Sequence, residues 1–182
     1  MTPFTAVVIP TERLILRLLG EADLPALYEI YSDVAVMRYW SRPAWTDQSQ
    51  AEQMLLDAQE GYRSGNGLQL GIERRADQAL VGSCSLFHFH HASRRAEIGY
   101  ILGRPYWGSG YMHEALRALL NYAFQTLDLH RLEADIDPRN LASARTLERL
   151  GFQKEGHLRQ RWIVNGEISD TWLYGLLRQE WV

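Results

Sequence analysis

The spacing of apolar residues changes near residue 110, and this change constrains the fold of the chain more than any other feature. Before it, Leu68, Leu70 and Ile72 alternate with polar residues or glycine, the period of two that predicts a β-strand. Residues 80–89 and 95–102 continue as β-rich runs. After it, apolar residues recur at helical spacing from residue 112 to residue 127. We therefore expect an antiparallel meander of three strands that leads into a long amphipathic helix.

Shorter elements precede the meander. We expect a strand at residues 13–18 and a helix at residues 21–31. A second helix is expected to follow Thr46, which we predict to be its N-cap, and to end near Gly65. One face of that helix carries four residues that we expect to be buried: Ala51, Leu55, Ala58 and Tyr62.

Alternating strands and helices follow the long helix. We expect a strand at residues 132–136, then a helix at residues 141–150 with Asn140 as its N-cap and Gly151 as its stop. Two further β-like runs flank Asn165-Gly166, a dipeptide that favours a two-residue hairpin turn. A strand that follows a crossover helix is expected to run parallel to a neighbour. The prediction is a mixed α/β sheet flanked by helices, in a single domain over residues 1–182.

Composition excludes several classes of protein. The net charge of -3 and the pI near 6.1 show no excess of basic residues, so a nucleic-acid partner is not expected. Cys84 is the only cysteine, which rules out an internal disulfide, and the start of the chain does not resemble a signal peptide. No apolar run approaches the ~20 residues that span a bilayer. We expect a soluble cytoplasmic protein with no membrane partner.

A glycine-containing turn joins the last meander strand to the long helix. Gly108 and Gly110 would let the backbone approach a ligand closely, and the free amides at a helix start suit a pyrophosphate. Taken alone, the pattern indicates a tight turn equally well. It is not a Walker loop, which needs a Lys-Ser/Thr pair after its last glycine. It is not the dinucleotide fingerprint either, because His113 stands where a third glycine is needed.

Several ordered motifs decide between these alternatives, because together they resemble the RimJ/RimL-type branch of the GNAT superfamily of N-acetyltransferases. The likeness covers nearly the whole chain and rests on Thr11-Glu12-Arg13-Leu14, Ala96-Glu97-Ile98-Gly99-Tyr100, Tyr106-Trp107-Gly108-Ser109-Gly110-Tyr111, Asn140-Leu141-Ala142-Ser143, Leu150-Gly151-Phe152 and Asn165-Gly166. The resemblance implies the GNAT fold, a central, mostly antiparallel sheet whose one parallel pair splays apart. It also implies an enzyme that takes acetyl-CoA as cosubstrate.

The resemblance assigns cofactor-binding roles to two segments and one helix start. The strand end would pair with the pantetheine arm, the glycine turn would bind the pyrophosphate through its backbone, and the helix start would contact pantetheine. These residues are Tyr100, Ile101 and Leu102; Trp107, Gly108, Ser109, Gly110, Tyr111 and Met112; and Asn140 with Ser143. The family pattern has Gln or Arg three residues before the first glycine, where this chain has Pro105 after Arg104.

The same resemblance suggests two catalytic residues, each with a structural alternative. Glu97 matches a position that supplies a carboxylate base in some members, and its alternative is a strand residue paired with Arg94 or Arg95. Ser143 matches a position that stabilises or protonates the departing thiolate, and its alternative is a role in capping the helix. Many members carry a tyrosine acid four residues later, where this chain has Leu147.

The acceptor is an amine whose identity the sequence leaves open. The RimJ/RimL likeness points to a protein N-terminal α-amino group, and the alternatives are small amines such as polyamines, amino acids or antibiotics, or a CoA-binding sensor without catalysis. A loop with Trp40, Arg42 and Trp45 would shape the acceptor pocket, or its aromatic residues would anchor the core. Family members often form homodimers, so a homodimer is one expected assembly.

The remaining chemically active residues do not form a convincing motif. His88, His90 and His91 lack further ligands at the spacing of a zinc site, and no metal is expected. Arg95 interrupts the histidine motif of chloramphenicol acetyltransferases. Cys84 lies in the middle of a predicted strand without an activating neighbour, so we expect a small buried residue rather than a nucleophile.

Overall fold

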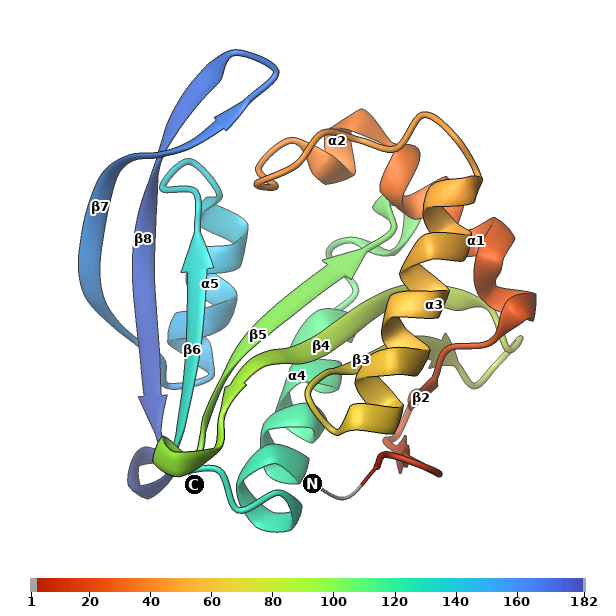
Figure 1. Cartoon of the computed structure of the whole chain (residues 1–182), viewed down its shortest axis with the longest axis horizontal. Helices are drawn as coiled ribbons and strands as arrows, with labels where there is room; N and C mark the ends of the chain where they lie inside the picture. Colours follow the sequence, from red (N-terminus) through yellow and green to blue (C-terminus); the bar gives the residue numbers. More distant parts are fainter. Residues whose placement is uncertain (1–2, 182) are drawn as a thin grey trace.

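One eight-stranded mixed sheet organises residues 3–181, the part of the chain that the computed structural model describes (Figure 1). Its strand order is β1-β2-β3-β4-β5-β6-β8-β7. The strands are β1 (Val8–Pro10), β2 (Leu14–Leu18), β3 (Leu68–Arg74), β4 (Leu80–His90), β5 (Arg95–Leu102), β6 (Arg131–Ile136), β7 (Gln153–Val164) and β8 (Glu167–Leu177). Strands β5 and β6 run parallel, and every other neighbouring pair is antiparallel. The mixed sheet and its parallel pair are therefore confirmed.

Helices cover both faces of the sheet. They are α1 (Leu24–Ser32), α2 (Val34–Met37), α3 (Ser49–Ser64), α4 (Tyr111–Asn121) and α5 (Leu141–Arg149), and a π-helical turn, Tyr122–Thr126, extends α4. In Figure 1, α1 and α3 lie in front of the sheet, and α4 and α5 lie behind it. Within residues 3–181, the helices fall short of the length and apolar character that a membrane crossing requires.

The predicted amphipathic faces are the faces that the helices bury. On α3, Ala51, Leu55, Ala58 and Tyr62 are all buried, and Gly65 ends the helix in a left-handed conformation with φ +70°. The predicted N-cap is wrong, because α3 begins at Ser49 and the Thr46 amide instead donates to Gln50 Oε1 at 2.8 Å. Sequence spacing also did not indicate β1, α2 or the π-helical turn.

The helix and turn signals of the last third agree with the structure. The Asn140 side chain accepts a hydrogen bond from the Ser143 amide at 3.1 Å, which caps α5, and Gly151 follows that helix with φ +91°. Asn165 and Gly166 have φ values of +50° and +80° and connect β7 to β8. This turn fixes the register of a long hairpin at the edge of the sheet.

Strands β5 and β6 pair only where both begin. Their register joins Arg95 to Arg131, Ala96 to Leu132 and Glu97 to Glu133, and no pairing between them continues beyond Glu97. Beyond this point β5 stays with β4 as far as Leu102, and β6 stays with β8 as far as Ile136. Because each strand follows its outer neighbour, the two halves of the sheet diverge (Figure 1).

We predict that the buried face of α3 carries much of the stability of the front layer. Leu55 is 5% exposed and its neighbour Leu56 is 59% exposed, so the pair forms a matched comparison on one helix. Leu55→Ala should lower the free energy of unfolding by about 2–5 kcal/mol, because it leaves a cavity. Leu56→Ala should change it by less than about 0.5 kcal/mol. Urea denaturation measures both, and equal losses would contradict this packing.

Candidate active site

The glycine turn between β5 and α4 presents a row of free backbone amides. Gly108 and Gly110 have φ values of +74° and +78°, which favour glycine, and α4 begins at Tyr111. Within residues 3–181, none of the amides of residues 108–112 donates a hydrogen bond to a protein acceptor. Unpaired amides at the positive end of a helix form a site for an anion.

Trp107 and Arg104 stabilise this turn and its surroundings. The half-exposed Trp107 indole donates from Nε1 to the Leu102 carbonyl at 2.7 Å, so that carbonyl is already occupied. Ile101 and Leu102 are buried, and only their backbone could contact a ligand. Arg104 forms an ion pair with Asp33 at 3.0 Å and is thereby tied to the α1–α2 junction.

The residues of the Thr11-Glu12-Arg13-Leu14 motif hold the start of α4 in place. Glu114 accepts from Thr11 Oγ1 at 2.6 Å, from the Arg13 amide at 2.8 Å and from Arg13 Nε at 2.7 Å. Burial acts to raise the pKa of Glu114, but these hydrogen bonds outweigh it and keep the pKa below its ordinary value. Arg13 also donates to the Ser109 carbonyl at 2.9 Å and lies over the Tyr111 ring. The ionised Glu114 therefore links the N-terminal strand to the glycine turn.

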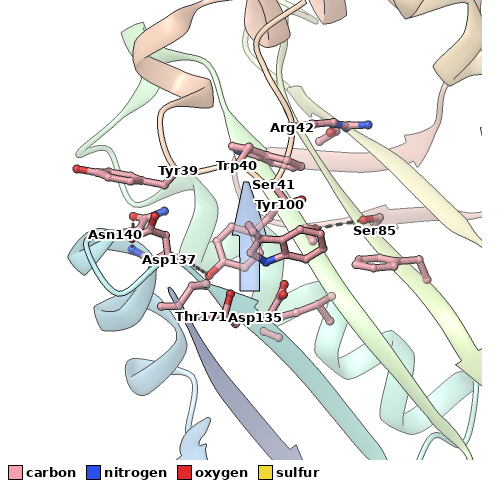
Figure 2. Close-up of a pocket in the computed structure, with 18 of the residues that line it drawn as sticks. Tyr39, Trp40, Ser41, Arg42, Ser85, Tyr100, Asp135, Asp137, Asn140 and Thr171 are labelled. Atoms are coloured by element: carbon pink, nitrogen blue, oxygen red, sulfur yellow. Dashed lines mark hydrogen bonds between the residues drawn. The ribbon is translucent and has the colours of Figure 1, made fainter. Parts of the chain in front are cut away.

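A cavity of about 390 Å³ occupies the gap between the diverging strands (Figure 2). Its walls come from both halves of the sheet, from the loop before α3 and from the start of α5. Among the lining residues are Tyr39, Trp40, Ser41, Arg42, Ser83, Ser85, Phe87, Gly99, Tyr100, Asp135, Asp137, Asn140, Ser143, Trp162, Ser169 and Thr171. The sequence-predicted residues Tyr100, Asn140 and Ser143 thus share one cavity, whereas the glycine turn lies outside its lining.

Tyr100 and Ser143 form a hydroxyl pair in this cavity. Their side-chain oxygens are 2.6 Å apart, and burial raises the pKa of the Tyr100 phenol, which stays protonated at neutral pH. Asn140 satisfies the Ser143 amide, so the Ser143 hydroxyl does not cap α5. Leu147 is fully buried. Position 147 therefore brings no hydroxyl to the cavity, whereas β5 brings that of Tyr100, a residue for which the sequence suggested only a backbone role.

Glu97 is the last residue of β5 that pairs with β6, and it lies outside the cavity lining. Its carboxylate contacts His88 Nδ1 at 3.1 Å, beside an irregular segment of β4 where His88 has φ +50°. The alternative pairing predicted from sequence is wrong, because Arg94 binds Asp128 and Arg95 binds Glu133, both at 2.6 Å. The structure does not bring Glu97 together with Ser143 in the cavity.

Asp135 is a cavity residue that sequence spacing did not single out. Burial raises the pKa of its carboxyl; Arg161, whose Nε lies 3.7 Å away, opposes the rise and Glu97 adds to it. Among the carboxyl groups of residues 3–181 whose pKa departs clearly from its ordinary value, Asp135 is the only one whose pKa is raised. The neighbouring Asp137 differs, because hydrogen bonds from Arg139 outweigh its burial and lower its pKa.

In the loop predicted to shape the acceptor pocket, some residues line the cavity and others pack into the core. Trp40 and Arg42 line the cavity, and Arg42 stacks over Tyr31 and Trp40 at 5.5 and 5.4 Å. Trp45 is instead buried against Tyr31, with ring centroids 4.5 Å apart. No carboxylate lies within ion-pair distance of Arg42 among the residues that the structure describes.

A second hollow of about 150 Å³ adjoins the cavity. It lies between α2, the loop after it and the β7–β8 turn, and it shares Trp40, Arg42, Asp137 and Ser169 with the cavity wall. Its other charged residues are in ion pairs, since Glu167 binds both Arg38 and Arg139, and Arg139 also binds Asp137. The two hollows therefore adjoin through their four shared residues.

Cys84 is a buried strand residue, as the sequence predicts. Its side chain is fully buried in β4, and burial raises the pKa of the thiol, which disfavours the nucleophilic thiolate. Of the three histidines, His88 contacts Glu97 and His91 stacks on Phe89 at 5.7 Å. The buried thiol and these histidine contacts do not indicate covalent catalysis.

Comparison with known proteins agrees with this arrangement. Residues 13–153 match the acetyltransferase (GNAT) domain model. The chain is 36% identical to the uncharacterized N-acetyltransferase p20 of Bacillus licheniformis, over 94% of this chain and 96% of that protein. It is 28% identical to the [ribosomal protein uS5]-alanine N-acetyltransferase of Escherichia coli, over 95% and 92%. The structure of Mycobacterium smegmatis RimJ in complex with CoA-disulfide superposes with a TM-score of 0.88 at 25% identity, covering 99% of this chain and 91% of that chain.

We predict that Cys84 takes no covalent part in turnover. Since it is the only cysteine, a thiol-reactive dye should label the native protein negligibly and the urea-unfolded protein fully. Incubation with acetyl-CoA should leave the mass of the intact protein unchanged. A stable acetylated form of the native enzyme, mapped to Cys84, would contradict this prediction.

Proposed function

Because this chain belongs to the GNAT family of acetyltransferases and is an acetyl-CoA-dependent N-acetyltransferase, we propose that its acceptor is the α-amino group of a protein N-terminus. The observation that carries the proposal is the extended surface formed by the cavity and the second hollow. If the N-terminal amine of a peptide lies in the cavity, the peptide residues that follow it need space, and the second hollow supplies that space. The relative that acetylates ribosomal protein uS5 supports the same substrate class.

One charge in the cavity wall, that of Arg42, favours a peptide over a polyamine. Arg42 brings an uncompensated positive charge to the wall, which would repel a second ammonium group but would suit peptide carbonyls or a carboxylate. An α-amino group also has a pKa of about 8, against about 10.4 for a lysine-like amine. A larger fraction of it is neutral at pH 7, so less work is left to a base.

We assign the acetyl-CoA contacts to the divergence of the sheet. The amides of residues 108–112 bind the diphosphate, since they have no acceptor among residues 3–181. The free edge of β5 at Tyr100 pairs with the pantetheine arm, and Asn140 and Ser143 line its path. The thioester then lies between the two halves of the sheet, next to the amine.

Transfer proceeds directly from thioester to amine. The nitrogen lone pair attacks the carbonyl carbon, the tetrahedral intermediate collapses with cleavage of the C–S bond, and the CoA thiolate departs. The Tyr100 phenol, hydrogen-bonded to Ser143, donates a proton to that sulfur and is reprotonated from solvent. The family resemblance predicts Glu97 as the base, but Glu97 lies outside the cavity lining.

The acceptor proposal is tested by thiol release with three candidate substrates. We expect turnover with a peptide that begins with a free alanine, with the added acetyl group mapped to its N-terminal residue. The same peptide with a blocked N-terminus and an internal lysine should show little turnover, and so should spermidine. Preferential acetylation of spermidine or of the lysine side chain would contradict the proposal.

We predict that the hydroxyl pair acts as a unit. Tyr100→Phe and Ser143→Ala should each lower kcat by about 10²-fold, within the range of general acid catalysis, with a smaller effect on the KM for acetyl-CoA. The double variant should lose little more than either single variant, because the two groups share one function. Steady-state kinetics measures this, and fully additive losses would show that the two hydroxyls act independently.

A further inference from the structure

Asp135 combines burial in the cavity with a weakly compensated charge. It lies on β6 across the cavity from Trp40 (Figure 2), and its side chain is 32% exposed. The other carboxylate in the lining, Asp137, forms an ion pair with Arg139 at 2.6 Å. The cation nearest to Asp135 is Arg161, whose Nε lies 3.7 Å away, beyond the length of a good hydrogen bond, and the Trp162 side chain adds a hydrogen bond with a smaller effect on its pKa. A carboxylate on a cavity wall without a close cationic partner is able to accept a proton.

The neighbours of Asp135 on every side define its charge environment. Arg161 faces it from β7, and Glu97 and His88 act on it from β5 and β4. On its own strand, Glu133 is bound to Arg95 and Arg131 and is not part of the cavity lining. Asp135 is therefore the carboxylate of this group that meets the cavity.

We propose that Asp135 is the general base of the reaction, accepting the proton that the acceptor amine loses. The inference rests on the proposed function only in placing the amine in the cavity. The ammonium form of the acceptor gives one proton to the Asp135 carboxylate, directly or through one water, and the neutral nitrogen then attacks the thioester. Asp135 returns that proton to solvent. The nitrogen loses its second proton to solvent as the tetrahedral intermediate collapses, which balances the proton that Tyr100 gives to the thiolate, so each turnover releases one proton overall.

This assignment gives Glu97 a different role from the one the family resemblance implies. Its negative charge acts on Asp135 and makes that carboxyl more basic, while its own carboxylate contacts His88. Glu97 is then a tuning residue and not the base. Removing the Glu97 charge should shift the pH dependence of kcat, whereas removing the Asp135 carboxylate should remove the base itself.

The test is the pH profile of kcat for the wild-type enzyme and three matched variants, with the alanine-initiated peptide as acceptor. Asp135→Asn should lower the plateau of kcat by about 10²-fold or more. Glu97→Gln should keep most of the plateau and move the acid limb to lower pH, because Asp135 becomes a weaker base. Glu133→Gln, on the same strand and two residues from Asp135, should leave the profile unchanged.

The opposite pattern would overturn the inference. A plateau kept in Asp135→Asn and lost in Glu97→Gln would make Glu97 the base. Equal activity in all variants would mean that the amine needs no base from this cluster. If spermidine is acetylated and the peptide is not, the acceptor proposal fails while the same variants, assayed with spermidine, still decide the role of Asp135.

Stability separates a catalytic role from a structural one. The native state holds the pKa of Asp135 above its unfolded value, so the ionised carboxylate disfavours folding at pH values above that pKa. Asp135→Asn should therefore melt at the same temperature as wild type or higher at pH 7, although its activity falls. A lower melting temperature with a proportional loss of activity would indicate a structural role.

Carboxyl NMR titration of the free enzyme, which needs no acceptor, should show that the pKa of Asp135 lies above the ordinary value of about 3.9. A pKa at or below that value would count against Asp135 as the base.

Discussion

The divergence of β5 from β6 is the constraint on which the rest of this structure depends. A parallel pair that stayed closed would bury both strand edges in mutual hydrogen bonds. Here the pairing stops after Glu97, because β5 keeps its register with β4 and β6 keeps its register with β8. The result is a wedge in the middle of a continuous sheet, with a free backbone edge on one side and a polar cavity on the other.

The elements around the wedge are fixed by contacts between distant parts of the chain. Glu114 ties the N-terminal strand to the start of α4, and the Trp107 indole ties the glycine turn back to the end of β5. The β7–β8 hairpin and the loop around Trp40 close the far side of the cavity. A rigid frame therefore surrounds a strand edge that is free to bind, which is the preorganisation that positioning of two substrates requires.

Local sequence signals predicted the elements well and the site only in part. Alternation, helical spacing, the Asn140 cap and the Asn165-Gly166 turn act over a few residues, so the chain reveals them directly. The Tyr100–Ser143 pair depends on how β5 and α5 meet in space, and no local pattern contains it. Asp135 alternates with Ala134 and Ile136, and nothing in that local pattern marks it as a site residue. It lines the cavity because β6 has parted from β5 at that point, and Trp162 of the β7–β8 hairpin lines the same cavity.

Hydrogen exchange with and without acetyl-CoA tests the central claim most directly, because it reports on the backbone amides of the wedge. The account predicts that the coenzyme slows exchange at the amides of residues 108–112 and at Tyr100 on the free edge of β5. The amides that pair β2 with β3, remote from the wedge, should be unaffected. Protection absent from both segments, while the coenzyme is demonstrably bound elsewhere, would contradict the account.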